Sequence, residues 1–214
     1  SAYVQAGPWR TLCASPERFL AKYGNTLHSQ PIKGTVKRGA TEAEDNALRD
    51  ALANSEKEQA ENVMIVDLVR NDLSRVADRD SVNVDELFGI QSFATVHQMI
   101  SSVSCTLRPD ASPLDIMRAT FPMGSMTGAP KLSAMKHIAR LEETGRGLYS
   151  GALGYVCPNG GWDLNVVIRS LMHHAETGRV DATFGGAITL LAEASAEYDE
   201  CLLKAKALRN CLVP

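Results

Sequence analysis

The chain has 214 residues and a formal net charge of -3, with 44% apolar and 22% charged residues, which is an ordinary composition for a globular protein. The charge balance gives no electrostatic reason to expect nucleic-acid binding, and no apolar run is long enough to predict a membrane span. The five cysteines are odd in number and form no CxxC pair, so a disulfide framework and a zinc knuckle are both disfavoured. We therefore expect a protein of the reducing cytoplasm, in one large domain or two small ones, without a nucleic-acid or membrane partner. The chain opens without Met, which we interpret as a fragment or a processed product.

The first part of the chain predicts a strand, a loop and two helices. "WRTLCASPERF" indicates a short strand that ends in a turn at Ser15-Pro16. After a loop, Thr41 is the expected cap of a helix, and Glu44 stands three residues later, as in a capping box. Polar and apolar residues then follow a helical period from Glu42 to about Ala77, which predicts two helices.

The middle of the chain predicts two strands and two more helices. Ser81 to Leu107 is rich in Val, Ile, Phe and Thr and indicates two strands. "SPLDIMRATF" predicts a short helix with Ser112 as its cap. "MGSMTGAPKLSAMKHIARLEE" is typical of a glycine-rich loop that leads into an amphipathic helix.

The last part of the chain predicts three long strands and a final helix. The strands are expected at about Leu148–Cys157, Trp162–His174 and Arg179–Leu191, separated by the hairpin-like stretches "PNGG" and "AETG". Ser195 to Leu212 is amphipathic at helical spacing. Strand runs and helices mix without strict βαβ alternation, so the fold class expected is α+β with a mainly antiparallel sheet.

Lys33 lies in "QPIKGTVKRG", a stretch with a turn-forming Pro and a Gly-Thr pair. A lysine in such a loop is either a surface charge or a nucleophile held against a substrate. The loop alone does not distinguish the two.

The final predicted helix places Glu197, Glu200 and Lys204 on one face, because spacings of three, four and seven residues bring side chains together. Two carboxylates one turn apart suit a hard cation such as Mg²⁺. The alternative is a solvated face with a Glu200–Lys204 ion pair, worth only about 0.3–0.5 kcal/mol.

"ENVMIVDLVRNDLSRV" combines an apolar stripe with an unusual density of charge. The stripe consists of Val63, Val66, Val69 and Leu73. Its polar neighbours are Glu61, Asp67, Arg70, Asn71 and Asp72. Periodicity alone predicts a core helix with polar edges, but charges that become buried must be paired or bound to something.

Three further stretches have both a functional and a structural interpretation. In "GSMTGAPK", Thr127 and free backbone N–H groups before a helix favour an anion, or simply a well-capped helix. In "FGGAIT", Gly185 and Gly186 inside a strand indicate a close backbone approach, or a twist point of the sheet. In "NVVIRSLM", Arg169 alternates with apolar residues and can hold a carboxylate bidentately, or form an edge ion pair.

The ordered motifs "SPERF", "PIKGT", "AENVMIVDLVRNDL", "VHQMIS", "GSMTGAPK", "GALGY", "VVIRS", "FGGAI" and "EYDECLLKA" together resemble those of the chorismate-utilising enzymes. That family includes anthranilate, aminodeoxychorismate, isochorismate and salicylate synthases. The resemblance covers nearly the whole chain. It implies a mainly antiparallel β-sandwich flanked by helices, with residues 1–214 forming the C-terminal portion of a larger chorismate-binding catalytic domain.

"PIKGT" and "AENVMIVDLVRNDL" are similar to the aminodeoxychorismate synthase branch, component I, which aminates chorismate at C4 in p-aminobenzoate and folate biosynthesis. Anthranilate and isochorismate synthases usually carry Ala where Lys33 stands. The resemblance therefore implies that Lys33 adds to C2 and expels the C4 hydroxyl, after which ammonia adds at C4 and expels the lysine. This is covalent catalysis by an amine, which is nucleophilic only when neutral.

The resemblance also implies roles for the other motif residues. Glu17 matches the general acid that protonates the departing hydroxyl. His97 matches a histidine near the ring and is expected among the catalytic residues with Lys33 and Glu17, although a lone His in a β-rich segment is also typical of a satisfied core residue. Glu61 and Glu200 match Mg²⁺ carboxylates, with Glu197 close by. The implied substrate-binding positions are Gly34, Thr35, Thr127, Tyr149, Arg169, Gly185, Gly186 and Lys204.

Family members are usually longer, and their N-terminal half completes the sandwich. A half-sandwich would expose an apolar face or an open sheet edge, which invites pairing. No amidotransferase Cys–His–Glu signature is present, so the resemblance implies a separate glutamine amidotransferase as the source of ammonia. Two alternatives stay open: anthranilate synthase component I, and a catalytically incomplete fragment that only binds chorismate, Mg²⁺ or a partner.

Overall fold

The structure is a computed structural model that describes residues 1–189 and 192–212. It divides into two compact units. The larger unit consists of Glu17–Gly145 and Tyr155–Leu164, and the smaller one of Ser1–Pro16, Arg146–Gly154 and Asn165–Pro214. Strand pairs in both sheets are antiparallel and helices accompany both sheets, so the α+β prediction with antiparallel sheets is confirmed. The prediction of one domain over residues 1–214 stays a prediction.

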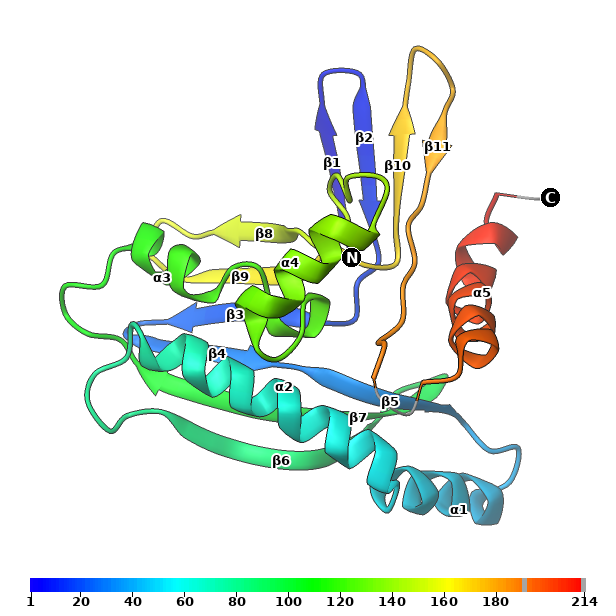
Figure 1. Ribbon diagram of the computed structural model, residues 1–214, viewed down its shortest axis with the longest axis horizontal. Coiled ribbons are helices and arrows are strands. Elements are labelled where there is room, and N and C mark those ends of the chain that lie inside the picture. Colours follow the sequence, from blue (N-terminus) through cyan, green and yellow to red (C-terminus); the bar gives the residue numbers. More distant parts are fainter. Residues whose placement is uncertain (190–191, 213–214) are drawn as a thin grey trace. The chain divides into compact units, whose positions relative to one another are not determined.

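Most strands of the larger unit belong to one seven-stranded sheet (Figure 1). Its order is β5-β7-β4-β3-β9-β8, and β6 also pairs with β7. The strands are β3 (Arg18–Tyr23), β4 (Thr26–Gln30), β5 (Ile32–Lys37), β6 (Asn83–Ser92), β7 (Val96–Thr106), β8 (Ala152–Val156) and β9 (Trp162–Val166). The long central strand β7 is almost entirely buried, so it fixes the positions of the strands beside it.

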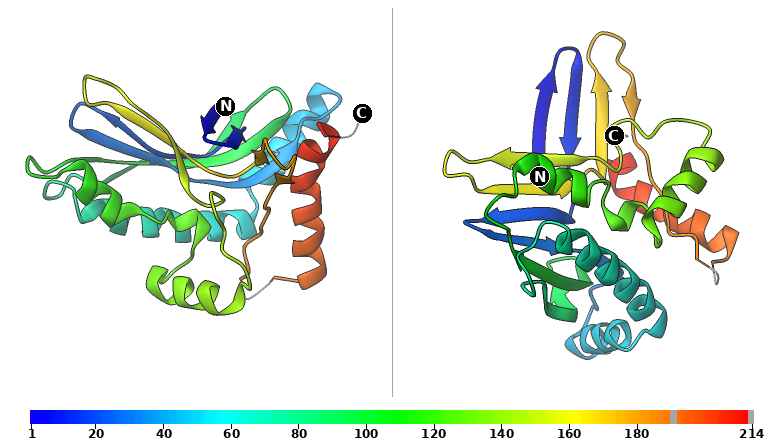
Figure 2. Two further views of the ribbon diagram at one scale, coloured as in Figure 1. Left: turned by 90° about the horizontal axis from the view of Figure 1, so that it is seen from above. Right: turned by 60° about the vertical axis from the view of Figure 1, so that its left-hand side comes forward.

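Helices α1 (Glu42–Ala53) and α2 (Glu56–Ser74) follow β5, and Figure 2 shows α2 running along one face of the sheet. The Thr41 hydroxyl accepts the backbone N–H of Glu44, as the sequence predicts. The Glu44 carboxylate reaches back to the N–H of Ala40 and not to that of Thr41. The two predicted helices are therefore confirmed, with each N-terminus capped by a hydroxyl side chain.

The face that α2 buries differs from the predicted stripe by one side chain. Val66, Val69 and Leu73 are buried as predicted, but Val63 is 44% exposed and Asn62 is completely buried. Asn62 takes that place because its amide oxygen accepts the Ser101 hydroxyl of β7 at 2.6 Å. Because its side chain is hydrogen-bonded, this polar residue can be buried even though apolar periodicity does not predict its burial.

The remaining helices of the larger unit are α3 (Pro113–Thr120) and α4 (Lys131–Leu141), joined by a loop that contains a short 3₁₀ helix, η1 (Gly124–Met126). Ser112 caps α3 in a reciprocal capping box with Asp115. Both helices were predicted from the sequence, and both are confirmed.

The smaller unit contains a four-stranded antiparallel sheet in the order β1-β2-β10-β11, and helix α5 (Ala194–Asn210). The strands are β1 (Ala2–Ala6), β2 (Trp9–Cys13), β10 (Ser170–His174) and β11 (Val180–Asp181). Large apolar side chains on this sheet are exposed, namely Tyr3, Val4, Trp9, Leu12 and Val180.

Two of the three long strands predicted near the C-terminus are wrong in extent. The segment Trp162–His174 forms two strands, β9 and β10, which belong to different sheets. Arg169 lies between them at φ +49°, a backbone angle that interrupts an extended strand. The predicted strand Arg179–Leu191 is reduced to β11, and its last two residues, 190 and 191, lie outside the described residues.

Gly185 and Gly186 therefore stand in irregular backbone and not inside a strand. The hairpins at "PNGG" and "AETG" are confirmed by backbone hydrogen bonds between Cys157 and Gly161 and between His174 and Arg179. Among the described residues, no helix is long and apolar enough to cross a membrane.

Candidate functional site

Lys33 and Glu61 form an ion pair in the larger unit. Strand β5 carries Lys33 and helix α2 carries Glu61, and the Lys33 Nζ lies 3.6 Å from the Glu61 Oε2. The two side chains are only 19% and 14% exposed. Lys33 is thus held against a carboxylate in a partly desolvated place and is not a freely solvated loop charge.

Glu17 is the most strongly perturbed carboxyl group near this pair. It is 7% exposed and precedes β3. Burial raises the pKa of Glu17 to about 7, although Ser125 and the Lys33 ammonium both act to lower it. A carboxyl group with such a pKa is in part protonated near neutral pH and can donate a proton, which is what a general acid requires.

Gly34 and Thr35 shape the strand next to Lys33. The pairing of β5 with β7 shifts register between Lys33 and Thr35, so a bulge lies at this point. Gly34 occupies it at φ +79°, and a Cβ there would lie 2.8 Å from the Leu52 side chain. A bulge re-aims the neighbouring side chains, and the Thr35 hydroxyl beside it accepts the amide of Gln98 at 3.3 Å.

The glycine-rich loop between α3 and α4 supplies Ser125 and Thr127. The Thr127 hydroxyl bonds the carbonyl oxygens of Met123 and Gly124, at 3.1 and 3.3 Å. The loop ends at Lys131, whose Nζ bonds the Asp72 carboxylate of α2 and the Thr120 carbonyl oxygen. Sequence reasoning missed Ser125 and the Asp72–Lys131 pair, although the motifs that contain them were recognised.

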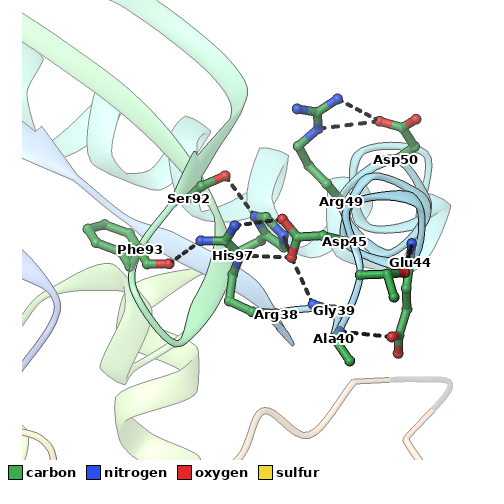
Figure 3. A network of polar contacts seen from close by, with 11 residues as sticks. Arg38, Gly39, Ala40, Glu44, Asp45, Arg49, Asp50, Ser92, Phe93 and His97 are labelled. Carbon is green, nitrogen blue, oxygen red and sulfur yellow. Dashed lines mark hydrogen bonds and ion pairs between the residues drawn. The ribbon is translucent and has the colours of Figure 1, made fainter.

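His97 lies on β7 and is 1% exposed. Its Nδ1 is 2.8 Å from the Ser92 hydroxyl and its Nε2 is 2.9 Å from the Asp45 carboxylate (Figure 3). Asp45 in turn accepts both ends of the Arg38 guanidinium and the N–H of Gly39. Both ring nitrogens are therefore satisfied within the protein.

The predicted acidic face of the last helix exists in the smaller unit. On α5, Lys204 Nζ forms an ion pair with the Glu200 carboxylate and donates to the Gly185 carbonyl oxygen at 3.0 Å. The Lys204 and Glu200 side chains are 27% and 46% exposed. This pair is more open to water than Lys33–Glu61.

The two glycines of "FGGAIT" approach other side chains closely, as the sequence predicts. A Cβ at Gly185 would lie 2.7 Å from the Tyr149 hydroxyl, and a Cβ at Gly186 would lie 2.8 Å from the Glu197 carboxylate. Arg169 is partly buried, which lowers the pKa of its guanidinium, while the Glu200 charge acts in the opposite direction. In the smaller unit, Gly185 thus lies close to Tyr149 and Gly186 lies close to Glu197, and Lys204 contacts both Gly185 and Glu200.

The carboxylates fit Mg²⁺ in their chemistry, because Glu61, Glu197 and Glu200 offer the oxygen ligands that a hard cation prefers. Within the described part of each unit, no three His, Cys, Asp or Glu side chains form a group that could hold a metal ion. Two of the carboxylates instead contact ammonium groups, Glu61 with Lys33 and Glu200 with Lys204. The magnesium assignment stays a prediction.

The structure places the predicted residues in two sets. The larger unit carries Glu17, Lys33, Gly34, Thr35, Glu61, His97 and Thr127. The smaller unit carries Tyr149, Arg169, Gly185, Gly186, Glu197, Glu200 and Lys204. The first set contains the groups suited to nucleophilic and acid catalysis, and the second contains groups suited to holding an anionic ligand.

The chain belongs to the chorismate binding enzymes, whose family pattern matches residues 1–210. It is 48% identical over 214 residues to the aminodeoxychorismate synthase of Streptomyces griseus. That match covers 99% of this chain and 29% of the relative. It is 39% identical to aminodeoxychorismate synthase component 1 of Bacillus subtilis, with 99% of this chain and 44% of the relative covered. The chain thus spans less than half the length of these relatives.

Among solved structures, anthranilate synthase component I from Streptococcus pneumoniae matches with a TM-score of 0.85 and 34% sequence identity. The match covers 96% of this chain and 45% of that chain. The likeness confirms the predicted family and its α+β fold.

Proposed function

We propose that this protein aminates chorismate at C4, giving 4-amino-4-deoxychorismate for p-aminobenzoate and folate biosynthesis. The observation that carries the proposal is Lys33, held 3.6 Å from Glu61 in a partly desolvated place near the protonatable Glu17. The relatives named aminodeoxychorismate synthase support it. A lysine in this position favours amination at C4 over direct addition at C2.

The proposed reaction is two successive displacements. The neutral Lys33 amine forms a bond to C2 of chorismate, the ring double bond shifts, and the C4 hydroxyl leaves as water with a proton from Glu17. Ammonia then forms a bond to C4, the double bond shifts back, and the Lys33 amine is released. The net change replaces hydroxyl by amine at C4, with one water formed for each ammonia consumed.

The other residues bind the substrate in this proposal. Arg169 and Tyr149 hold the enolpyruvyl carboxylate, for which a guanidinium offers bidentate hydrogen bonds. The remaining positions that line the substrate are Gly34, Thr35, Thr127, Gly185, Gly186 and Lys204.

Glu61, Glu197 and Glu200 are the carboxylates that we assign to Mg²⁺. When bound, the ion neutralises the ring carboxylate of chorismate and withdraws electrons from the ring. For Glu61, this role requires the carboxylate to exchange its Lys33 contact for the cation.

The ammonia comes from a glutamine amidotransferase partner in this proposal. The name "component 1" of the Bacillus subtilis relative is consistent with an enzyme of more than one component. A cytoplasmic location stays a prediction. The two alternatives, anthranilate synthase component I and a fragment that only binds its ligands, are separated from the proposal by the experiment below.

The test is intact-protein mass spectrometry after incubation with chorismate and Mg²⁺ in the absence of ammonia. We expect an adduct of chorismate minus water that maps to Lys33 in the wild type and is absent in Lys33→Ala. Lys37→Ala, on the same strand β5, is the matched control and should keep the adduct. When ammonia is added, the wild type should form the C4 amine.

Each other outcome rejects a defined part of the proposal. If Lys33→Ala aminates C4 as fast as the wild type, the covalent role of Lys33 is wrong. If the product carries nitrogen at C2, the anthranilate alternative is correct. If chorismate binds without an adduct and without turnover, the chain is a binding fragment.

A further inference from the structure

The network around His97 joins four segments of the larger unit. Arg38 follows β5, Asp45 lies in the first turn of α1, Ser92 ends β6 and His97 lies near the start of β7. Figure 3 shows that the Arg38 guanidinium and the His97 ring both point toward the Asp45 carboxylate. The Arg38–Asp45 contact is bidentate, with nitrogen–oxygen distances of 2.8 and 2.6 Å.

The donors around Asp45 fix the proton on the His97 ring. The Asp45 carboxylate accepts hydrogen bonds from Arg38, Gly39 and His97, and these bonds hold the pKa of Asp45 well below its usual range. An ionised carboxylate can only accept a hydrogen bond, so the His97 Nε2 must carry a proton. In the neutral ring Nδ1 is then the acceptor, and the Ser92 hydroxyl at 2.8 Å is its donor.

This arrangement leaves neither ring nitrogen free for a substrate. Proton release from Nε2 would turn its lone pair toward a carboxylate, which is unfavourable at 2.9 Å. The ring therefore has the surroundings of a structural link and not those of a proton-transfer group.

The network also determines where β5 lies. His97 pairs with Val36 across the two strands, and the Arg38 backbone N–H donates to Thr95. The Arg38 guanidinium additionally bonds the Phe93 carbonyl oxygen at 2.7 Å. These contacts secure the end of β5 just beyond the Gly34 bulge, and the bulge sets the direction of Lys33.

We infer that Asp45 and Arg38 are positioning residues, and that His97 acts with them as an Nε2-protonated link that holds the Lys33 strand in place without exchanging a proton with substrate. The inference rests on the proposed function of Lys33. It changes the role of His97 from the predicted catalytic residue to a positioning residue, and it adds Asp45 and Arg38, which the sequence did not single out.

The first experiment reads the ring directly, without an activity assay. In ¹⁵N-histidine-labelled whole protein, the His97 signals are assigned by their loss in His97→Gln. We expect the neutral ring to carry its proton on Nε2 and to accept a hydrogen bond at Nδ1. The opposite tautomer would overturn the inference.

The second experiment measures position and rate in the same variants. His97→Gln keeps a donor toward Asp45, whereas His97→Leu and Asp45→Asn break the link. We expect the latter two to shift the backbone amide signals of residues 33–36 and to lower kcat by up to about a hundredfold, with His97→Gln keeping most of the wild-type kcat. The matched control is Asp50→Asn. Asp50 is an exposed carboxylate on the same helix that pairs with Arg49, and its replacement should change neither.

The outcomes separate this inference from the proposed function. If His97→Gln is as inactive as His97→Leu while the amide signals of β5 stay unchanged, His97 takes part in the chemistry and the inference is wrong. If the wild type does not aminate C4, the proposed function fails, and the tautomer and the β5 amide signals still decide whether the link exists. If His97→Leu does not fold, Asp45→Asn and His97→Gln carry the same comparison.

Discussion

The two units of the protein use the same pair of charges in different surroundings. In the larger unit, Lys33 and Glu61 are 19% and 14% exposed and lie near Glu17, which is almost completely buried. In the smaller unit, Lys204 and Glu200 are 27% and 46% exposed on the face of a helix. The chemical groups are the same, and the difference between the sites is their access to water.

The difference in access to water suits the two regions to different chemical roles. A carboxyl group removed from water is easier to protonate, which explains why the pKa of Glu17 rises to about 7. A solvated ion pair contributes little to stability but keeps its charges available to a ligand. The larger unit is therefore suited to acid and nucleophilic catalysis, and the smaller one to holding charged groups.

The largest effect is expected from Glu17→Gln, which removes the buried acid. We expect C4 amination to fall by about 10²–10⁴-fold, the usual contribution of a general acid. In the wild type, the rate should also decline as pH rises through about 7, because Glu17 then loses its proton. Steady-state rates across pH provide the measurement. Asp67→Asn, an exposed carboxylate on α2, is the control and should leave the rate unchanged.

The next largest effect is expected on stability, and it tests whether a buried ion pair contributes more than an exposed one. Lys131→Met leaves the Asp72 carboxylate, which is only 7% exposed, without its ammonium partner, and should cost about 3–5 kcal/mol in the free energy of unfolding. Arg70→Met breaks the exposed Asp67–Arg70 pair on the same helix and should cost at most about 1 kcal/mol. Urea unfolding compares the two variants. Equal costs would show that burial does not separate these pairs.

A companion variant shows whether charge or packing causes the loss. Replacing both partners, Asp72→Leu with Lys131→Met, removes the uncompensated buried charge and should recover most of the lost stability. If the double variant is as unstable as Lys131→Met, the hydrogen bond from Lys131 to Thr120 is the more important contact.

A third effect appears as a dependence of stability on pH. Folding raises the pKa of Glu17 from 4.5 to about 7, so the folded state favours the protonated carboxyl. The contribution of Glu17 to stability is thus fully present below about pH 4.5 and is lost as pH rises through about 7, a change of about 3 kcal/mol. Glu17→Gln should not show this loss. Unfolding curves of both proteins between these pH values give the difference, and parallel pH profiles would contradict the assignment.

Local sequence patterns were sufficient for most helices and hairpins. Thr41 and Ser112 cap helices as predicted, because a cap depends on residues three positions away. The predicted strand Trp162–His174 was wrong because Arg169 has a positive φ that interrupts it, and alternating polarity gives no signal of that backbone angle. Asn62 replaced Val63 in the core for a similar reason, since its partner Ser101 lies in a distant strand.

Within the candidate site, contacts between residues close in sequence were also predicted, and contacts between distant segments were not. The Glu200–Lys204 contact follows from helical spacing and was predicted as an alternative to a metal site. The Lys33–Glu61 pair joins a strand and a helix, so the residues were found only through the family motifs. Asp45 was missed as a partner of His97, because 52 positions separate the two residues and neither stretch indicates the contact.

The smallest stability effect is expected from Glu200→Gln in the smaller unit. Because the Glu200 side chain is 46% exposed, loss of its pair with Lys204 should change the free energy of unfolding by only about 0.3–0.5 kcal/mol. Chorismate turnover should nevertheless fall sharply if Glu200 holds Mg²⁺, and raising the Mg²⁺ concentration should restore part of it. Asp199→Asn, the adjacent exposed carboxylate on α5, is the control for both measurements. A loss of stability as large as that of Lys131→Met would mean that this pair is structural, and the contrast between the two units would disappear.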